Sequence, residues 1–145
     1  MHADVARAEF METLTGVGRR IRTAFNARVV AHGLTYARAR TLFCLSRLGR
    51  LTQSELAAEL ELENATVVRL LDGMEKLHLI SRLPVENDRR AKHVVLTKHG
   101  QAQADIVATI AAELRDEIIG DIATADLRGA AAVLRTLAKR LDPAS

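Results

Sequence analysis

The sequence is poor in the residues that mark disulfide-linked or aromatic-rich proteins. One cysteine, two prolines and no tryptophan occur among 145 residues, and aromatic residues make up 3%. A single cysteine excludes an internal disulfide framework and suits a reducing compartment. No apolar run approaches the roughly 20 residues that cross a bilayer, and the N-terminus lacks the basic and apolar segments of a secretory signal. We therefore expect a cytoplasmic protein without a membrane partner.

Metal-binding and catalytic patterns are also missing. The histidines are scattered, and no two of them have the i, i+4 spacing that places ligands on one face of a helix. No nucleophile elbow or phosphate-binding glycine loop is present. Cys44, the lone thiol, falls in an apolar helical pattern and is predicted to be a core residue. We predict no metal, no cofactor and no enzymatic activity.

Helical patterns account for most of the chain. Hydrophobic residues make up 48% of the sequence and charged residues 27%, which is typical of a globular protein. Apolar residues recur every three or four positions, as in amphipathic helices, and Leu127, Leu134 and Leu141 have heptad-like spacing. The expected helices are Val5–Val30, Tyr36–Leu48, Gln53–Glu59, Ala65–Leu77 and Lys98–Ile119, with a last helix on the leucine pattern.

Polar residues at the expected helix starts support these boundaries. Thr52 and Glu55 have the spacing of a capping box, in which each side chain accepts a hydrogen bond from a free N–H group at the helix start. Thr35, Asn64 and Thr97 are suitable caps for the helices that follow them.

A hairpin with a basic tip follows the fourth helix. Two β-type runs, Leu79–Val85 and His93–Thr97, enclose the polar segment Glu86–Lys92, and Pro84 suits an edge strand. Helix, helix and basic hairpin is the order of a winged helix-turn-helix. We predict a mainly α fold with a small β-hairpin (α+β), in which residues 35–97 form a winged helix-turn-helix DNA-binding unit.

The remaining residues, 1–34 and 98–145, are predicted to form a helical dimerisation region within the same continuous domain. Their long helices carry more apolar surface than one monomer of this shape covers. A second copy would bury that surface symmetrically. We therefore expect a two-fold homodimer.

The helix expected at Ala65–Leu77 has two different faces. One side is apolar and should face the core; it carries Val67, Leu70, Leu71, Met74 and Leu77. On the opposite side, Val68 suits a thymine methyl group, and Arg69 suits guanine or a phosphate. Free N–H groups at a helix start favour phosphate oxygens. DNA contacts are predicted for Val68 and Arg69 at bases and for Ser54, Asn64 and Thr66 at phosphates, with Ala65 small enough for close approach.

The hairpin tip is typical of a finger that enters the minor groove of DNA. A narrow A·T-rich minor groove concentrates negative potential and attracts an inserted arginine, which we assign to Arg89. Asp88 does not fit phosphate attraction, and we expect it to pair with Arg90 or Arg69. Further DNA contacts are predicted at Arg90 and Lys92, near phosphates, and at Arg82, at the base of this hairpin, which is the wing of the predicted fold.

Four segments together resemble the MarR family of bacterial transcriptional regulators. They are Thr-Gln-Ser-Glu-Leu-Ala at 52–57, Val-Val-Arg-Leu-Leu-Asp-Gly-Met-Glu at 67–75, Leu-Ile-Ser-Arg at 79–82 and Asn-Asp-Arg-Arg-Ala-Lys at 87–92. The Asp-Arg-Arg-Ala-Lys wing is most similar to the SlyA-like branch. The resemblance implies a homodimeric repressor on a pseudo-palindromic operator, with DNA contacts from Arg69 and from Asp88, Arg89 and Arg90.

The resemblance also implies a possible effector. Many members of the family release DNA when a phenolic or other small aromatic anion enters a cleft, here formed by helix one, Thr35 and Tyr36 at the start of helix two, and helix five. An alternative from another class is a helical protein-interaction module whose winged-helix scaffold no longer binds DNA. The salt dependence of DNA binding separates the two, because only phosphate contacts release counterions.

Overall fold

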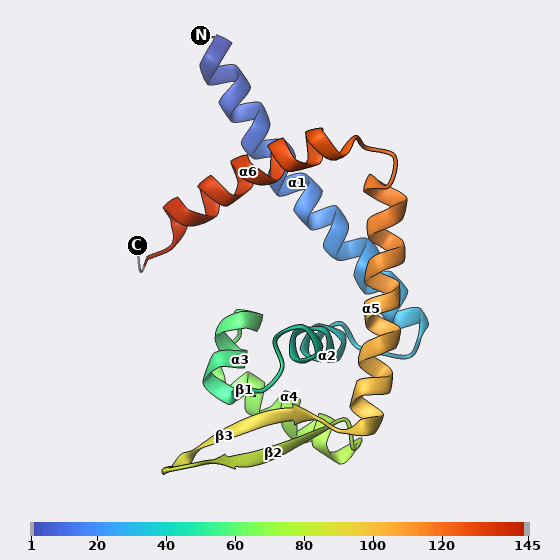
Figure 1. The fold of residues 1–145 in the computed structure, drawn as a ribbon, viewed down its shortest axis with the longest axis vertical. Coiled ribbons are helices and arrows are strands. Elements are labelled where there is room, and N and C mark those ends of the chain that lie inside the picture. Colours follow the sequence, from blue (N-terminus) through green and yellow to red (C-terminus); the bar gives the residue numbers. More distant parts are fainter. Residues whose placement is uncertain (1, 144–145) are drawn as a thin grey trace. The chain divides into compact units, whose positions relative to one another are not determined.

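A computed structural model describes residues 2–143, which form six helices and one three-stranded antiparallel sheet (Figure 1). The predicted fold class, mainly α with a small β element, is confirmed. The chain divides into two compact units, one up to Ala112 and one from Glu113. The elements are α1 His2–Ala31, α2 Tyr36–Leu48, β1 Leu51–Thr52, α3 Gln53–Leu60, α4 Asn64–Lys76, β2 Ile80–Val85, β3 Asp88–Leu96, α5 Lys98–Ile119 and α6 Thr124–Leu141.

Threonine side chains cap the starts of α2 and α3, as predicted. Thr35 Oγ1 accepts a hydrogen bond from Arg38 N at 3.2 Å. Thr52 and Glu55 form the capping box, in which each side chain accepts a hydrogen bond from the other residue's N–H group. These bonds satisfy donors that a helix start otherwise leaves free.

The turn between α3 and α4 differs from the predicted one. Glu61 adopts a left-handed conformation with φ 55°, and its N–H group donates to carbonyls of the last turn of α3. α4 then begins at Asn64, with Glu63 in the cap position and without a side-chain cap hydrogen bond. The predicted cap at Asn64 is therefore wrong, because the tight left-handed turn starts the helix one residue earlier.

The sheet has the order β1-β3-β2, and both pairings are antiparallel. The two-residue strand β1, which pairs Leu51 with Val94, was not predicted, because so short a segment has no readable alternation. The strand β2 lies at an edge of the sheet, where Pro84 removes no needed ladder hydrogen bond. The edge position predicted for Pro84 is confirmed.

The hairpin turn is shorter than the predicted tip, Glu86–Lys92. Only Glu86 and Asn87 form the turn, and Asn87 has a left-handed φ of 66°. The strand β3 begins at Asp88, which pairs with Val85. The sequence did not predict this start, because the first residues of β3 are charged and the usual signal of a strand is hydrophobic alternation. A solvent-exposed hairpin needs no such alternation, since its strands pair through the backbone.

Buried leucine, valine and methionine side chains form the core of the first unit. Val67, Leu71 and Met74 of α4 are buried, as predicted, and Cys44 of α2 belongs to the same core. Leu77 was also predicted to be buried, but it is 45% exposed. The reason is that α4 ends at Lys76, so Leu77 no longer follows the helical path.

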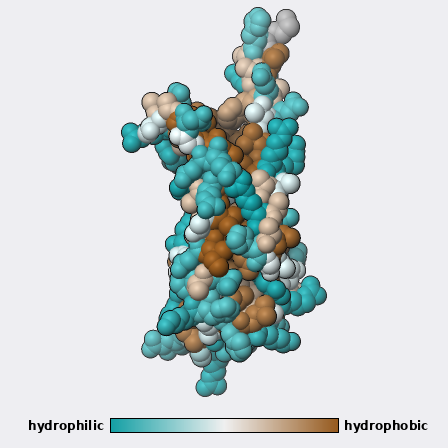
Figure 2. All heavy atoms as spheres, turned by 90° about the vertical axis from the view of Figure 1, so that its right-hand side faces the viewer, coloured by the Kyte–Doolittle hydropathy of each residue, from teal (hydrophilic) through white to brown (hydrophobic). Residues whose placement is uncertain are grey.

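The two terminal helices leave most of their apolar side chains exposed. Val29 is the buried residue of α1, and Phe10 and Val17 are exposed. The helix α6 buries no residue, and its Leu141 is 80% exposed. Figure 2 shows hydrophobic residues, in brown, at the molecular surface. Among residues 2–143, no helix has the length and apolar character needed to cross a membrane.

Candidate nucleic-acid interface

The helices α3 and α4 and the turn between them form a helix-turn-helix. Leu56 and Leu60 of α3 are buried in one core with Val67 and Leu71 of α4. This packing holds one side of α4 and leaves the opposite side accessible. The β2–β3 hairpin follows α4, and in Figure 1 its tip extends past α3.

The residues predicted to contact bases lie on the accessible side of α4. Val68 is 38% exposed. Arg69 is exposed, and within residues 2–143 its guanidinium makes no hydrogen bond or ion pair. At the start of α4, Asn64 and Ala65 are exposed and Thr66 is half-buried. Because α4 has no side-chain cap, its first N–H groups are available to an anion.

Ser54 is exposed in the first turn of α3, next to the capping box. The neighbouring Glu55 carboxylate accepts a hydrogen bond from Thr52 N at 3.0 Å. This hydrogen bond is the main cause that lowers the pKa of the Glu55 carboxyl group below its ordinary value of 4.5. Glu55 therefore holds the helix start, and the Ser54 side chain beside it stays exposed.

The wing presents two arginines to solvent. Arg89 and Arg90 are exposed, and in the part of the chain described their guanidinium groups have no hydrogen-bond or ion-pair partner. Lys92, farther along β3, is half-buried. Asp88 Oδ1 accepts a hydrogen bond from the main-chain N of Arg90 at 2.9 Å. The predicted ion pair of Asp88 with Arg90 or Arg69 is not formed, because the short aspartate side chain binds the backbone two residues on. Asp88 thus holds the backbone at the start of β3 and leaves both arginine side chains free.

Arg82 differs from the other predicted arginines because its side chain is only 18% exposed. Its Nη2 atom lies 2.5 Å from Asp72 Oδ1 and 3.3 Å from Glu75 Oε1. Its Nε atom donates to Glu75 Oε2 at 3.5 Å, and its Nη1 atom donates to Gln53 Oε1 at 3.3 Å. The hydrogen bond with Glu75 is the largest cause of a raised pKa of Arg82, which keeps the guanidinium charged. Arg82 therefore links β2 to both α3 and α4.

Sequence reasoning did not identify the three partners of Arg82. Asp72 and Glu75 lie one helical turn apart on α4, and Gln53 opens α3. One signal was available in the sequence: two carboxylates are out of place on a helix that is expected to meet a polyanion. Their contact with Arg82 accounts for them.

A pocket of about 350 Å³ lies between α4 and the wing. Val68 and Lys92, both predicted to contact DNA, are among its lining residues, and Arg82 lines it together with its partners Gln53 and Glu75. Val68 of α4 and Arg82 and Lys92 of the hairpin therefore border one depression in the surface.

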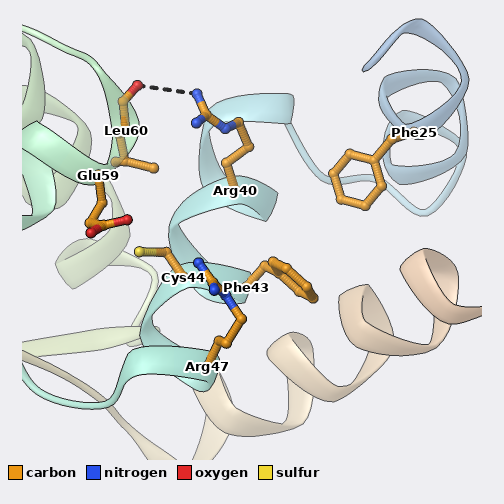
Figure 3. A pocket seen from close by; sticks show the side chains of 7 residues that line it. All are labelled: Phe25, Arg40, Phe43, Cys44, Arg47, Glu59 and Leu60. Carbon is orange, nitrogen blue, oxygen red and sulfur yellow. Dashed lines mark hydrogen bonds between the residues drawn. The ribbon is translucent and has the colours of Figure 1, made fainter. Parts of the chain in front are cut away.

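A second pocket, of about 110 Å³, lies between α1, α2 and α3 (Figure 3). Arg40 borders it; its Nη1 atom donates to Leu60 O at 3.2 Å, and its guanidinium lies 5.7 Å from the centre of the Tyr36 ring. Burial, followed by the charge of Glu59, raises the pKa of the Cys44 thiol above its ordinary value of 9.0. The pocket is lined by Phe25, Arg40, Phe43, Cys44, Arg47, Glu59 and Leu60.

The cleft expected from helices one, two and five is found only in part. A pocket of about 320 Å³ is lined by Arg22 of α1 and by Tyr36 and Arg40 of α2, and its other lining residues are Leu60, Glu61 and Leu62, not residues of α5. Across residues 2–143, no group of three or more histidine, cysteine, aspartate or glutamate side chains is arranged to hold a metal ion.

The fold and the exposed basic groups define the class of winged helix-turn-helix proteins. Residues 34–92 match the MarR family. The crystal structure of transcriptional regulator PA3341 is 34% identical, with 91% of this chain and 97% of that chain covered and a TM-score of 0.83. AbsC, a MarR family transcriptional regulator from Streptomyces coelicolor, is 26% identical, with 90% of each chain covered and a TM-score of 0.78. This chain belongs to the MarR family, whose members are transcriptional regulators and not enzymes.

A further solved structure, the S. aureus MepR–DNA complex, shares the fold. It is 21% identical, 92% of this chain and 98% of that chain are covered, and the TM-score is 0.76.

Proposed function

We propose that this protein is a sequence-specific regulator of transcription that binds double-stranded DNA as a homodimer, on a pseudo-palindromic operator, and represses its target genes in the cytoplasm. The observation that carries the proposal is the exposure of Arg69, Arg89 and Arg90 without partners among the described residues. Guanidinium groups on a recognition helix and a wing suit bases and phosphates. Membership of the MarR family supports the same function, and the Asp-Arg-Arg-Ala-Lys wing favours the SlyA-like branch.

The proposed contacts divide into those with bases in the two grooves and those with the DNA backbone. Val68 and Arg69 contact base edges in the major groove, and Arg89 enters the flanking minor groove. The remaining residues hold the DNA backbone: Ser54, Asn64 and Thr66 with the small Ala65 at the helix starts, and Arg90 and Lys92 on the wing. Asp88 holds the backbone of the wing at the start of β3.

The proposed homodimer is supported by the exposed apolar side chains of the terminal helices. Phe10 and Val17 of α1 and Leu134 and Leu141 of α6 are exposed in the single chain. A two-fold interface would remove such surface from water, at roughly 25 cal/mol per Å². Sedimentation at micromolar concentration tests this; a monomer under these conditions would contradict the proposal.

Selection of bound duplexes from a random pool tests the function itself. We expect a palindrome whose half-sites lie about one helical turn apart, on the order of 10 base pairs. A dimer that neutralises roughly 6–10 phosphates should lose about 10³–10⁵ in affinity between 50 and 200 mM salt. No selected sequence and no salt-dependent binding would instead favour the helical protein-interaction module.

We also propose that a small aromatic anion releases the DNA. The pocket between α1, α2 and α3 combines the rings of Phe25 and Phe43 with the guanidinium groups of Arg40 and Arg47. An aromatic carboxylate suits such a pocket, because its ring meets the apolar wall and its charge meets an arginine. Arg40 also holds the Leu60 carbonyl at the end of α3, so a carboxylate that competes for Arg40 would disturb the turn that leads into α4.

Benzoate is a suitable probe of this effector site, and benzamide is its neutral control. Benzoate should raise the Kd of the operator complex, and the effect should weaken in Arg47→Ala. Benzamide, which has the same ring without the charge, should have little effect. An equal effect of both compounds, or none of benzoate, would contradict the effector proposal without affecting the DNA-binding proposal.

A further inference from the structure

We infer that Arg82 is a positioning residue: with Asp72 and Glu75, it sets the placement of the wing relative to the recognition helix, and it acts on DNA binding through this placement. The inference rests on the proposed DNA-binding function. It assigns to Arg82 a different role from the direct contact at the base of the wing that the sequence suggested. It also assigns a role to two carboxylates on α4 that DNA binding by itself does not explain.

The hydrogen bonds of Arg82 leave it poorly suited to a direct phosphate contact. All three guanidinium nitrogens donate to protein oxygens: Nε and Nη2 to the two Glu75 oxygens, Nη2 also to Asp72, and Nη1 to Gln53. These bonds use four of the five guanidinium N–H groups, so only the second N–H of Nη1 is left for a phosphate. The paired Nε and Nη2 donors, which are the geometry arginine uses for bidentate contacts, are already occupied by Glu75.

Because of the position of Arg82 in the hairpin, these hydrogen bonds hold the base of the wing against α3 and α4. Arg82 lies opposite Val94, which is fully buried in the core, whereas the next residues of β2 toward the tip, Leu83 and Pro84, are exposed. Arg82 is thus near the last position at which β2 contacts the body of the unit. Because Arg89 lies beyond it, a small tilt at this level moves the tip by a larger distance.

The charges around Arg82 provide the second argument. The side chains of Asp72 and Glu75 are about half exposed, on the helix that is proposed to meet a polyanion. Carboxylates at such a site oppose DNA binding through Coulomb repulsion. Glu75 and Arg82 line the pocket between α4 and the wing together with Val68 and Lys92. Two carboxylates at this site favour DNA binding only if their placement of the wing through Arg82 outweighs their repulsion of the DNA phosphates.

Direct contact and positioning predict opposite signs for one substitution. If Arg82 only contacts phosphate, Asp72→Asn removes a repelling charge, frees Arg82 for the DNA, and tightens binding. If Arg82 positions the wing, Asp72→Asn loosens its anchor and weakens binding, even though the protein becomes more basic. We expect operator affinity to fall by about three- to tenfold per dimer, because each half-exposed ion pair is weak and two copies are lost.

Glu63→Gln is the matched control. Glu63 is an exposed acidic residue at the start of α4, and it makes no side-chain cap hydrogen bond. Its neutralisation changes the charge by the same amount without touching Arg82, so it should tighten DNA binding slightly. Glu75→Gln, which loses the two-oxygen ionic contact with Arg82, should weaken binding as Asp72→Asn does, and it carries the test if Asp72→Asn fails to fold.

The wing itself supplies a readout that a loss of general stability would not change. In an Arg89→Ala background the proposed minor-groove contact is absent, so displacement of the wing affects only the proposed backbone contacts of Arg90 and Lys92. Asp72→Asn should then weaken binding by a smaller factor than in the wild-type background, and the preference for A·T flanks should already be flat. Affinity for the selected operator is measured for each single and double variant at two salt concentrations, with thermal unfolding of the same samples.

Two results would overturn the inference. One is tighter binding by Asp72→Asn, matching Glu63→Gln; the other is a loss in Asp72→Asn that persists unchanged in the Arg89→Ala background. Failure of the wild-type protein to select any DNA would be a separate result, because it would refute the proposed function before Arg82 is tested.

Discussion

A methyl group added at Gly100 should destabilise the protein even though Gly100 lies in a helix, where alanine is normally preferred. Gly100 is in the first turn of α5, at the point where the helix passes the end of α4 and the start of β2. A Cβ atom built on Gly100 would lie 1.8 Å from the main-chain oxygen of Leu79 and 2.8 Å from its carbonyl carbon. No real Cβ contact is that short, so Gly100→Ala must move the backbone.

The neighbouring hydrogen bonds make that movement costly. Leu79 O accepts a hydrogen bond from Thr97 N at 3.1 Å, and Leu79 N donates to Met74 O at 2.9 Å. Overpacking typically costs about 1–3 kcal/mol, and loss of one main-chain hydrogen bond adds about 1 kcal/mol. Against this, alanine gains roughly 1 kcal/mol over glycine in a helix. The free energy of unfolding should therefore fall by about 1–3 kcal/mol.

Urea unfolding at one fixed protein concentration measures this change, and Gly73→Ala is the matched control. Gly73 also lies inside a helix, but a Cβ there would be 3.9 Å from its nearest neighbour, the Nη2 atom of Arg38, which is an ordinary contact. Gly73→Ala should stabilise the protein by roughly 0.5–1 kcal/mol. Equal stabilisation by both substitutions would show that α5 does not approach Leu79 as closely as described.

Four further predictions concern the DNA contacts and the lone thiol. Arg69→Ala should weaken operator binding by about 1–3 kcal/mol and relax specificity at one base pair of each half-site, as measured by binding to single-base operator variants; unchanged specificity would refute its base contact. Arg89→Ala should lower affinity and abolish any preference for A·T flanks, and a flank preference equal to wild type would place Arg89 outside the minor groove. Cys44 should react with iodoacetamide more slowly than a free thiol at neutral pH, because burial raises its pKa and keeps it protonated. The folded state holds this proton more tightly than the unfolded state, so the free energy of unfolding should fall as the pH rises above 9.0, the ordinary pKa of the thiol. This fall should be smaller in Cys44→Ala.

The features that the sequence predicted well depend on short-range rules. Thr35 and Thr52 cap helices because their hydroxyl groups reach N–H groups three residues on, which is a matter of spacing alone. The apolar side of α4 was predictable for the same reason, since a helix repeats every 3.6 residues. The basic wing was found because Arg89 and Arg90 follow a turn sequence. Family membership followed from these motifs together.

The failures occurred where a local choice depended on the surroundings. Asn64 was assigned as a cap because its side chain suits that position, yet the left-handed turn at Glu61 placed it inside the helix. The length of the wing tip was overestimated because β3 begins at the charged residue Asp88, which pairs with Val85. In both cases the residue types permit two structures, and packing of the neighbouring segments selects one.

The sequence by itself determined the helices, their main caps, the order of the helices and the hairpin, and the class of protein, because periodicity, capping and motif spacing are properties of neighbouring residues. Only the tertiary structure decided what Arg82 does. Its partners Asp72 and Gln53 lie 10 and 29 positions away along the chain. A charged side chain takes its role from the groups that folding brings within hydrogen-bond distance, and no local pattern records which groups those are.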